Sequence, residues 1–174
     1  MNRRSMKAVL ASGITALLVA AGAAVAGADR DGGNVRAKLK GFEEVPSVST
    51  VASGKFKAKI DRSEQRIDYK LSFEGLEANA LFAHIHLGQR AANGGVSVFL
   101  CGGGDKPPCP ATAGTVEGTI DPADVIGPEN QGIAPGEFDE LVRAIRAGVT
   151  YANVHSSKFP GGEIRGQIRG GGDD

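Results

Sequence analysis

Aromatic residues, histidine and cysteine are all scarce in this chain of 174 residues. It contains no tryptophan, two tyrosines, three histidines and two cysteines. Net charge is missing as well, because 20 basic residues balance 20 acidic ones. Nucleic-acid-binding domains usually carry a basic excess, so the balance argues against nucleic acid as a partner.

The chain also lacks an apolar run long enough for a transmembrane helix, which needs about 20 residues. Its longest run, residues 8–21, follows a basic start and precedes small residues that end at Ala26. This order predicts a signal peptide over residues 1–26, cleavage after Ala26, and no stable membrane insertion afterwards. We therefore expect a secreted or periplasmic, cell-envelope protein. Arg3 and Arg4 leave both general secretion and twin-arginine export open.

Past the predicted cleavage site, the chain divides into three parts. Residues 27–34 form a short linker, residues 35–169 one domain, and residues 170–174 a flexible Gly- and Asp-rich tail. The domain is of ordinary size and long enough to bury a single core.

The two cysteines lie in the segment CGGGDKPPC, at Cys101 and Cys109. In an exported chain a disulfide is the expected state of such a pair. The spacing does not match a redox-active CxxC motif, so we expect a structural staple in a long loop.

Hydrophobic residues alternate with polar ones through most of the domain, a period of two that is typical of strands. In VRAKLKG, for example, Val35, Ala37 and Leu39 alternate with basic residues. The pattern recurs in GKFKAKID, RIDYKLSFEGL, AHIHL, GGVSVFLC, AGTVEGTID, VTYANVHS and GGEIRGQI. About eight short strands separated by turn residues predict an all-β fold, an antiparallel sandwich or barrel.

One segment, PGEFDELVRAIRAG, follows a helical period instead. Its apolar residues are spaced as on one face of a helix, at Phe138, Leu141, Val142 and Ile145. Gly148 is placed to end this short helix in a left-handed conformation. We expect it to cover one end of the sandwich.

Several separated motifs resemble the CHRD domain, the repeat first noted in chordin and widespread in exported bacterial proteins. They are LKGFEEVPSV, AHIHLGQRAANGGVSVFLC and LVRAIRAGVTYANVHSSKFPGGEIRGQI, in the expected order. The resemblance implies an immunoglobulin-like, Greek-key β-barrel with faint similarity to copper-zinc superoxide dismutase. Gly166 and Gln167 depart from the Cys and Gly of the family's closing motif. The resemblance implies no general biochemical activity.

Two of the three histidines, His84 and His86, lie one residue apart on a predicted strand. Alternate residues of a strand share a face about 6.6 Å apart, so both point away from the core-facing Ile85. His155 has the same polar-side position in YANVHSS. If these strands are neighbours, the three imidazoles converge on one outer, solvent-exposed face, with Glu163 and Arg165 beside them as supporting or structural residues.

Two interpretations of the histidines stay open. Three imidazoles suit copper or zinc with one open coordination position, and the order HxH, then VH, then a closing Gly/Arg strand resembles the copper half of a dismutase. No histidine remains to bridge to zinc, so full dismutase activity is not expected. A metal site should lose its ion as pH falls toward the ordinary histidine pKa of about 6.5. Alternatively, the histidines only anchor loops through hydrogen bonds.

Other catalytic arrangements lack their motifs. Ser156 and Ser157 adjoin a histidine, but no GxSxG segment exists to support a serine hydrolase. Glu43 and Glu44 are neighbours in an extended segment and point apart, so we interpret them as solvated rather than as a catalytic pair.

Basic residues line the polar side of the first two predicted strands. They recur at every second position: Arg36, Lys38 and Lys40, then Lys55, Lys57 and Lys59. If the strands are neighbours, the six form a positive patch suited to an anionic cell-envelope polymer. The alternative is that these lysines protect exposed strand edges against pairing with other chains.

The sequence thus favours a secreted binding or structural module over an enzyme, with an unknown protein or cell-envelope polymer as partner. A copper or zinc site at His84, His86 and His155 is the sharper alternative.

Overall fold

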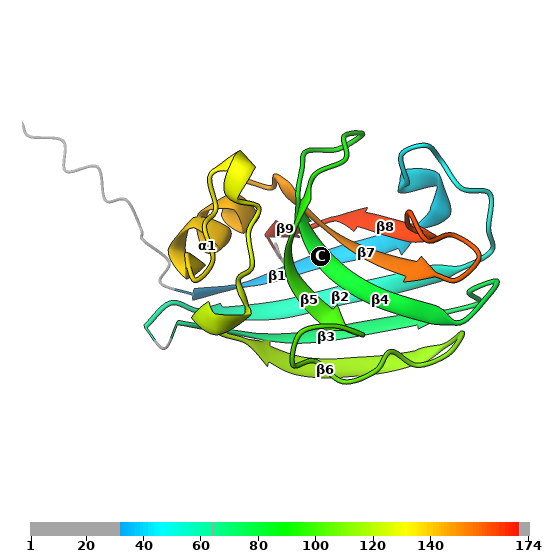
Figure 1. Cartoon of the computed structure of the whole chain (residues 1–174), viewed down its shortest axis with the longest axis horizontal. Coiled ribbons are helices and arrows are strands. Elements are labelled where there is room, and N and C mark those ends of the chain that lie inside the picture. The colour runs from blue at the N-terminus through cyan, green and yellow to red at the C-terminus, as the bar shows by residue number, and fades with distance from the viewer. Residues whose placement is uncertain (1–31, 64, 171–174) are drawn as a thin grey trace, which may run out of the picture.

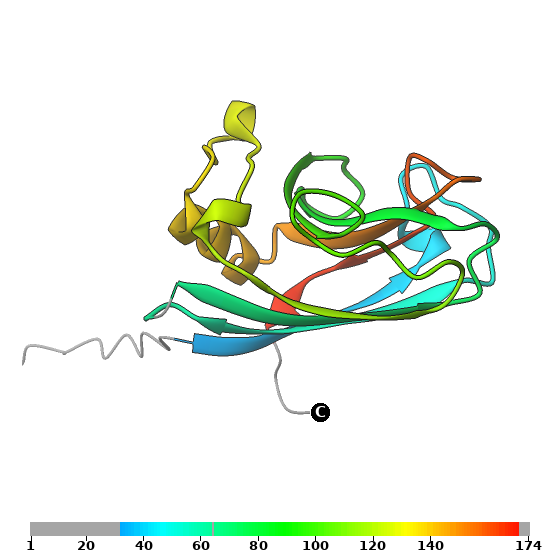
Figure 2. The ribbon, with the colours of Figure 1, turned by 60° about the horizontal axis from the view of Figure 1, so that its bottom comes forward.

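The computed structural model describes residues 32–63 and 65–170. Its strands form one antiparallel sheet that curls into a nearly closed barrel (Figures 1 and 2). In chain order they are β1 (Gly32–Lys40), β2 (Ser53–Asp61), β3 (Arg66–Glu74), β4 (Ala80–Leu87), β5 (Gly95–Cys101), β6 (Gly114–Ile120), β7 (Thr150–Ser156), β8 (Ile164–Gln167) and β9 (Arg169–Gly170). The all-β prediction is confirmed; the ninth strand is the short β9.

The order of strands across the sheet differs from their order in the chain. It runs β5-β4-β7-β8-β1-β2-β3-β6, and β9 pairs with β1. The late strands β7 and β8 are therefore inserted between β4 and β1. This crossover makes β4 and β7 neighbours, although about 60 residues separate them in the sequence.

The alternating pattern explains which side of each strand is buried. On β1, Val35, Ala37 and Leu39 are at most 6% exposed, whereas the residues between them face solvent. Phe56 and Ile60 on β2 continue this core. Each fully buried side chain of this size contributes about 1.5–3 kcal/mol relative to an exposed one. The inward side of the sheet is therefore fixed by the sequence pattern.

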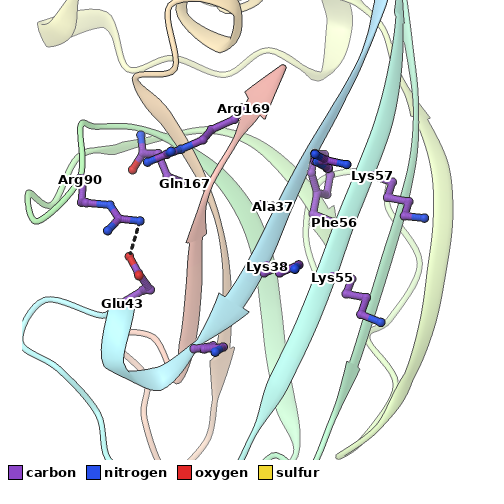
Figure 3. A pocket seen from close by; sticks show the side chains of 11 residues that line it. Ala37, Lys38, Glu43, Lys55, Phe56, Lys57, Arg90, Gln167 and Arg169 are labelled. Atoms are coloured by element: carbon purple, nitrogen blue, oxygen red, sulfur yellow. Dashed lines mark ion pairs between the residues drawn. The ribbon is translucent and has the colours of Figure 1, made fainter. Parts of the chain in front are cut away.

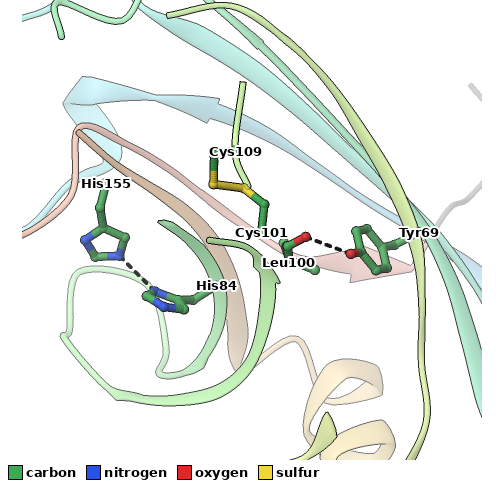
Figure 4. Close-up of a disulfide and its surroundings, with 6 residues drawn as sticks. All are labelled: Tyr69, His84, Leu100, Cys101, Cys109 and His155. Atoms are coloured by element: carbon green, nitrogen blue, oxygen red, sulfur yellow. Dashed lines mark hydrogen bonds between the residues drawn. A yellow bond between two sulfur atoms is a disulfide. The ribbon is translucent and has the colours of Figure 1, made fainter. Parts of the chain in front are cut away.

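Two interactions lie at the open side of the barrel, where β5 and β6 end the strand order. The Tyr69 hydroxyl on β3 donates a hydrogen bond of 2.7 Å to the Leu100 carbonyl on β5 (Figure 4). The predicted disulfide between Cys101 and Cys109 is confirmed; it joins β5 to the loop that follows it, with 5.0 Å between the Cα atoms. The hydrogen bond therefore links β3, the neighbour of β6, to β5 at the other end of the strand order, and the disulfide fixes the loop between β5 and β6.

The predicted helix is α1 (Phe138–Arg146), and it covers one end of the barrel (Figure 1). Its four apolar residues are all buried: Phe138, Leu141, Val142 and Ile145. Gly148 follows with a φ of +70°, a left-handed conformation that favours glycine. Three short 3-10 helices complete the described segments: η1 (Gly41–Glu43), η2 (Pro122–Asp124) and η3 (Glu129–Gln131).

Strand β1 begins at Gly32 and β9 ends at Gly170. The predicted signal peptide, residues 1–26, lies outside the described residues, as do most of the predicted linker and tail. No helix formed by residues 32–63 or 65–170 has the length and apolar character needed to cross a bilayer.

Candidate metal centre

The pairing of β4 with β7 brings the three histidines together. On β4, His84 lies opposite Asn153 and His86 opposite Tyr151, while His155 on β7 lies opposite Phe82. All three imidazoles lie on the same side of these two strands. The Nδ1 atom of His84 is 3.2 Å from the Nε2 atom of His155 (Figure 4), and one ring nitrogen from each histidine lies within 4.8 Å of the other two.

The histidines do not lie on a solvent-exposed face, in contrast to the expectation from the sequence. Their exposed fractions are only 6% for His84 and 7% for His86 and His155. The side of the strand is as expected, because Ile85 points into the core. Strand alternation, however, does not show that the loops around residues 88–94 and 157–162 fold over this side.

Two backbone carbonyls from these loops fix the imidazole tautomers. His86 Nδ1–H donates to the Gly94 carbonyl at 3.0 Å, and His155 Nδ1–H donates to the Pro160 carbonyl at 2.9 Å. A carbonyl can only accept, so Nδ1 carries the proton and Nε2 keeps its lone pair in both rings. Metal-binding histidines are typically oriented in this way.

Buried ring nitrogens in the cluster lack partners. Among the described residues, no group forms a hydrogen bond with His86 Nε2 or with His84 Nε2, and both atoms are inaccessible to solvent. Leaving a buried polar atom unpaired costs about 1–3 kcal/mol. The lone pair of His86 Nε2 is therefore a buried acceptor that an ion could satisfy.

Aromatic rings enclose the cluster. Phe82 stacks on His84 at 5.6 Å between ring centroids, and Phe99 meets His84 edge-on at 4.5 Å. Tyr151 stacks on His86 at 4.8 Å with parallel rings. These contacts restrict the rotation of two imidazoles and exclude water from them.

Burial keeps the imidazoles neutral. It lowers the pKa of His84 to about 3 and that of His86 to about 4, and the proximity of His155 adds to both effects. It also lowers the pKa of His155. The neutral ring is the form that can ligate a metal, and all three rings stay neutral well below pH 6.5. If the histidines hold an ion, these shifts move the expected pH of metal loss below 6.5.

Arg165 supports the loop that holds His86. It is 2% exposed, and its guanidinium donates hydrogen bonds to the carbonyls of Gln89 and Ala92 and to the side chain of Asn93. Its other face stacks on the Tyr151 ring, with 3.4 Å from Cζ to the ring centroid. Arg165 therefore acts through the loop of residues 88–95.

Glu163 lies outside this network. It is fully buried, and its Oε1 atom accepts hydrogen bonds from the Thr50 hydroxyl at 3.0 Å and from the Glu77 amide at 2.9 Å. Within the described part of the chain, no hydrogen bond joins it to a histidine. Its contacts tie the start of β8 to the loops before β2 and β4.

Glu44 was missed by the sequence argument, which treated it as solvated. It is only 7% exposed, and Asn153, the strand partner of His84, donates to its Oε1 atom at 2.6 Å. Burial raises the pKa of Glu44 to about 7, against the opposing effects of Asn153 and the Arg165 charge. Alternation along β7 places Asn153 and Tyr151 on the side of His155, so the sequence pattern could have predicted that these two residues lie near the histidines. No such pattern could have predicted this for Glu44.

The sequence profile of the CHRD domain matches residues 35–168. The chain belongs to the CHRD domain family. Comparison with curated proteins and with solved structures finds no match for this chain.

The CHRD domain also carries the basic residues that the sequence predicted to share a surface. Strands β1 and β2 are direct neighbours, with Arg36 opposite Lys57 and Lys38 opposite Lys55. Lys59 lies farther along β2, opposite Asn34 on one side and Asp68 on the other. The basic surface is on the outside of β1 and β2, and the histidine cluster is on β4 and β7.

Proposed function

We propose that this CHRD-domain protein is an exported metal-binding module in which His84, His86 and His155 hold one copper or zinc ion. The ligand atoms are His84 Nδ1, His86 Nε2 and His155 Nε2. The signal-like residues 1–26, together with the disulfide, support export to an oxidising compartment.

The distance between His84 Nδ1 and His155 Nε2 carries the proposal. Two nitrogen ligands at about 2.0–2.1 Å from one tetrahedral ion are roughly 3.3 Å apart. The observed separation is 3.2 Å. Without an ion, this distance is spanned by a hydrogen bond in which His84 Nδ1–H donates to His155 Nε2; an ion would take the place of that proton, with His84 protonated on Nε2 instead. Two further observations support the proposal. The tautomers of His86 and His155 leave a lone pair on Nε2 of each ring, and the low pKa values keep the histidines uncharged.

The donor set favours copper or zinc over harder ions. Three neutral imidazoles suit these metals, whereas calcium and magnesium prefer oxygen ligands. Copper(II) should bind more tightly than zinc, following the general order of affinities for such ligands. With three protein ligands, an ion would keep an open position for water or another small ligand.

We assign binding rather than a reaction to this site. Arg165, the cation that the sequence argument placed beside the histidines, is already engaged by three acceptors of the loop and by the Tyr151 ring.

Isothermal titration with copper(II) and zinc(II) at pH 7 tests the proposal, using the disulfide-intact chain without residues 1–26. We expect one ion per chain, and loss of binding in His84→Ala and in His155→Ala. Ser157→Ala is the matched control, because Ser157 is exposed and next to the end of β7. Binding should persist at pH 5.5, where a site of ordinary histidines would weaken. Absence of binding by the folded parent would overturn the proposal.

A further inference from the structure

A basic groove lies on the outer face of the sheet, away from the histidines. It has a volume of about 560 Å³ and is shown in Figure 3. Six of its cationic side chains come from neighbouring strands: Arg36, Lys38 and Lys40 on β1, Lys55 and Lys57 on β2, and Arg169 on β9. Arg90 adds a seventh cation from the loop after β4. The one acidic residue in the lining, Glu43, is paired with Arg90 at 3.4 Å.

The cations of the groove are placed in rows across the strands. Arg36 on β1 lies between Arg169 on β9 and Lys57 on β2, and Lys38 lies opposite Lys55. Like charges directly opposite each other destabilise a sheet. In the part of the chain that the structure describes, no carboxylate forms an ion pair with Lys38 or Lys55. Among the described residues, the repulsion between Lys38 and Lys55 is therefore not neutralised by an ion pair.

Protection of a sheet edge does not explain these lysines. Charged residues discourage pairing where a strand edge is exposed, but β2 lies between β1 and β3, and β1 lies between β2 and β8. The two ends of the strand order are β5 and β6. The basic residues are thus concentrated on interior strands, in a chain with no net charge overall.

We propose that this groove binds a linear polyol-phosphate chain, a polyanion of phosphodiester-linked alcohols without aromatic groups. The site is separate from the metal centre, and the proposal does not depend on it. Phosphate suits the groove because one guanidinium group, such as that of Arg36 or Arg169, can donate two parallel hydrogen bonds to the oxygens of one phosphate.

The spacing of the cations selects an extended phosphodiester. Side chains at alternate positions of β1 recur about every 6.6–6.8 Å. A chain with six single bonds between successive charges, as in a three-carbon polyol phosphate, extends by about 7 Å per repeat, the length of two extended residues. Successive phosphates can therefore meet successive cations along β1.

The absence of an aromatic surface in the groove argues against single-stranded nucleic acid, which has a similar backbone repeat. Proteins that bind single strands stack bases on exposed aromatic rings. The one aromatic residue in the lining is Phe56, and it is 1% exposed because its ring belongs to the core.

Binding of a fluorescent poly(glycerol phosphate) oligomer, measured by anisotropy, tests the proposal. With about five phosphate contacts, affinity should fall roughly 100-fold between 50 and 200 mM salt. The double variant Lys38→Gln, Lys55→Gln should weaken binding and lower the log–log salt slope by about 1.4. The matched control is Lys70→Gln, Lys158→Gln, which removes two lysines that have acidic partners, Glu117 and Glu77. It should leave the slope unchanged.

The groove variant should stay folded, because it relieves repulsion between opposed lysines; its unfolding temperature should be no lower than that of the parent. The variant His84→Ala should bind the oligomer like the parent, which separates this site from the metal centre. Equal binding by the groove variant and the control would overturn the proposal, as would absence of binding by the parent. If oligothymidylate or oligogalacturonate bound more tightly than the poly(glycerol phosphate) oligomer, the proposal of a polyol phosphate would be overturned in favour of that class of polyanion.

Discussion

Acid should destabilise the metal-free protein through its histidines. Their pKa values in the folded state are about 3 for His84 and about 4 for His86, against 6.5 for an ordinary histidine. Below pH 6.5 these histidines bind protons in the unfolded chain but not in the folded chain. Each histidine therefore lowers the free energy of unfolding by about 1.4 kcal/mol for each pH unit of acidification. Between pH 7 and pH 5 these two histidines remove about 4 kcal/mol. His155 acts in the same direction.

Glu44 should offset part of this loss. Its pKa is raised from 4.5 to about 7 in the folded state, so the folded chain binds the proton more tightly than the unfolded chain does. Its stabilising contribution is complete below pH 4.5 and is lost as pH rises through 7. Between pH 7 and pH 5 it adds about 2 kcal/mol. The parent should therefore lose about 2 kcal/mol or more over this interval, a measurable part of a typical total of about 5–15 kcal/mol.

Urea unfolding at pH 7, 6 and 5, in the presence of a chelator, measures these contributions separately. Glu44→Gln keeps an acceptor for Asn153 but cannot titrate, so its loss of stability should be about 2 kcal/mol larger than that of the parent. His84→Gln should make the loss about 2 kcal/mol smaller. Glu44→Gln with the same pH dependence as the parent would refute the reasoning about Glu44. His84→Gln with an undiminished loss would refute the reasoning about the cluster.

Three other perturbations test the supports of the site and the barrel. Arg165→Lys removes the planar fork that holds the loop over the histidines, so we expect metal affinity, measured by titration, to fall about 10-fold or more. The Cys101–Cys109 disulfide closes a loop between two cysteines that are eight positions apart. Its reduction should lower the free energy of unfolding, measured in urea, by about 2.5 kcal/mol. Tyr69→Phe leaves the buried Leu100 carbonyl without its donor and should cost about 1–3 kcal/mol in the same assay. Unchanged affinity or unchanged stability would contradict the respective prediction.

Local patterns in the sequence were sufficient for the strands, the helix and the side of each strand that is buried. Alternation separated Ile85 from His84 correctly because successive side chains of any strand point to opposite sides. The spacing of apolar residues found α1, and the two cysteines led to the disulfide. Each of these conclusions depends on neighbours within a few residues, which is why a single sequence was enough.

Burial of the polar residues could not be predicted in this way. Glu44 follows the short helix η1, outside any alternating pattern, and it is buried because Asn153, 109 positions later, lies beside it. The histidines are enclosed because loop carbonyls and aromatic rings meet over β4 and β7. Exposure of a residue that points away from the core depends on which loops fold over it, and those contacts are distant in the chain.

The sequence by itself determined that this protein is a β-barrel of the CHRD type, with three histidines and six basic residues on the polar sides of its strands. Only the tertiary structure decided that His84 and His155, 71 positions apart, lie with their ring nitrogens 3.2 Å from each other. It also decided that the basic residues lie on interior strands rather than edges. The physical reason is the same in both cases: the backbone alternation that orients a side chain is local, whereas the order of strands in the sheet is set by packing between segments far apart in the chain.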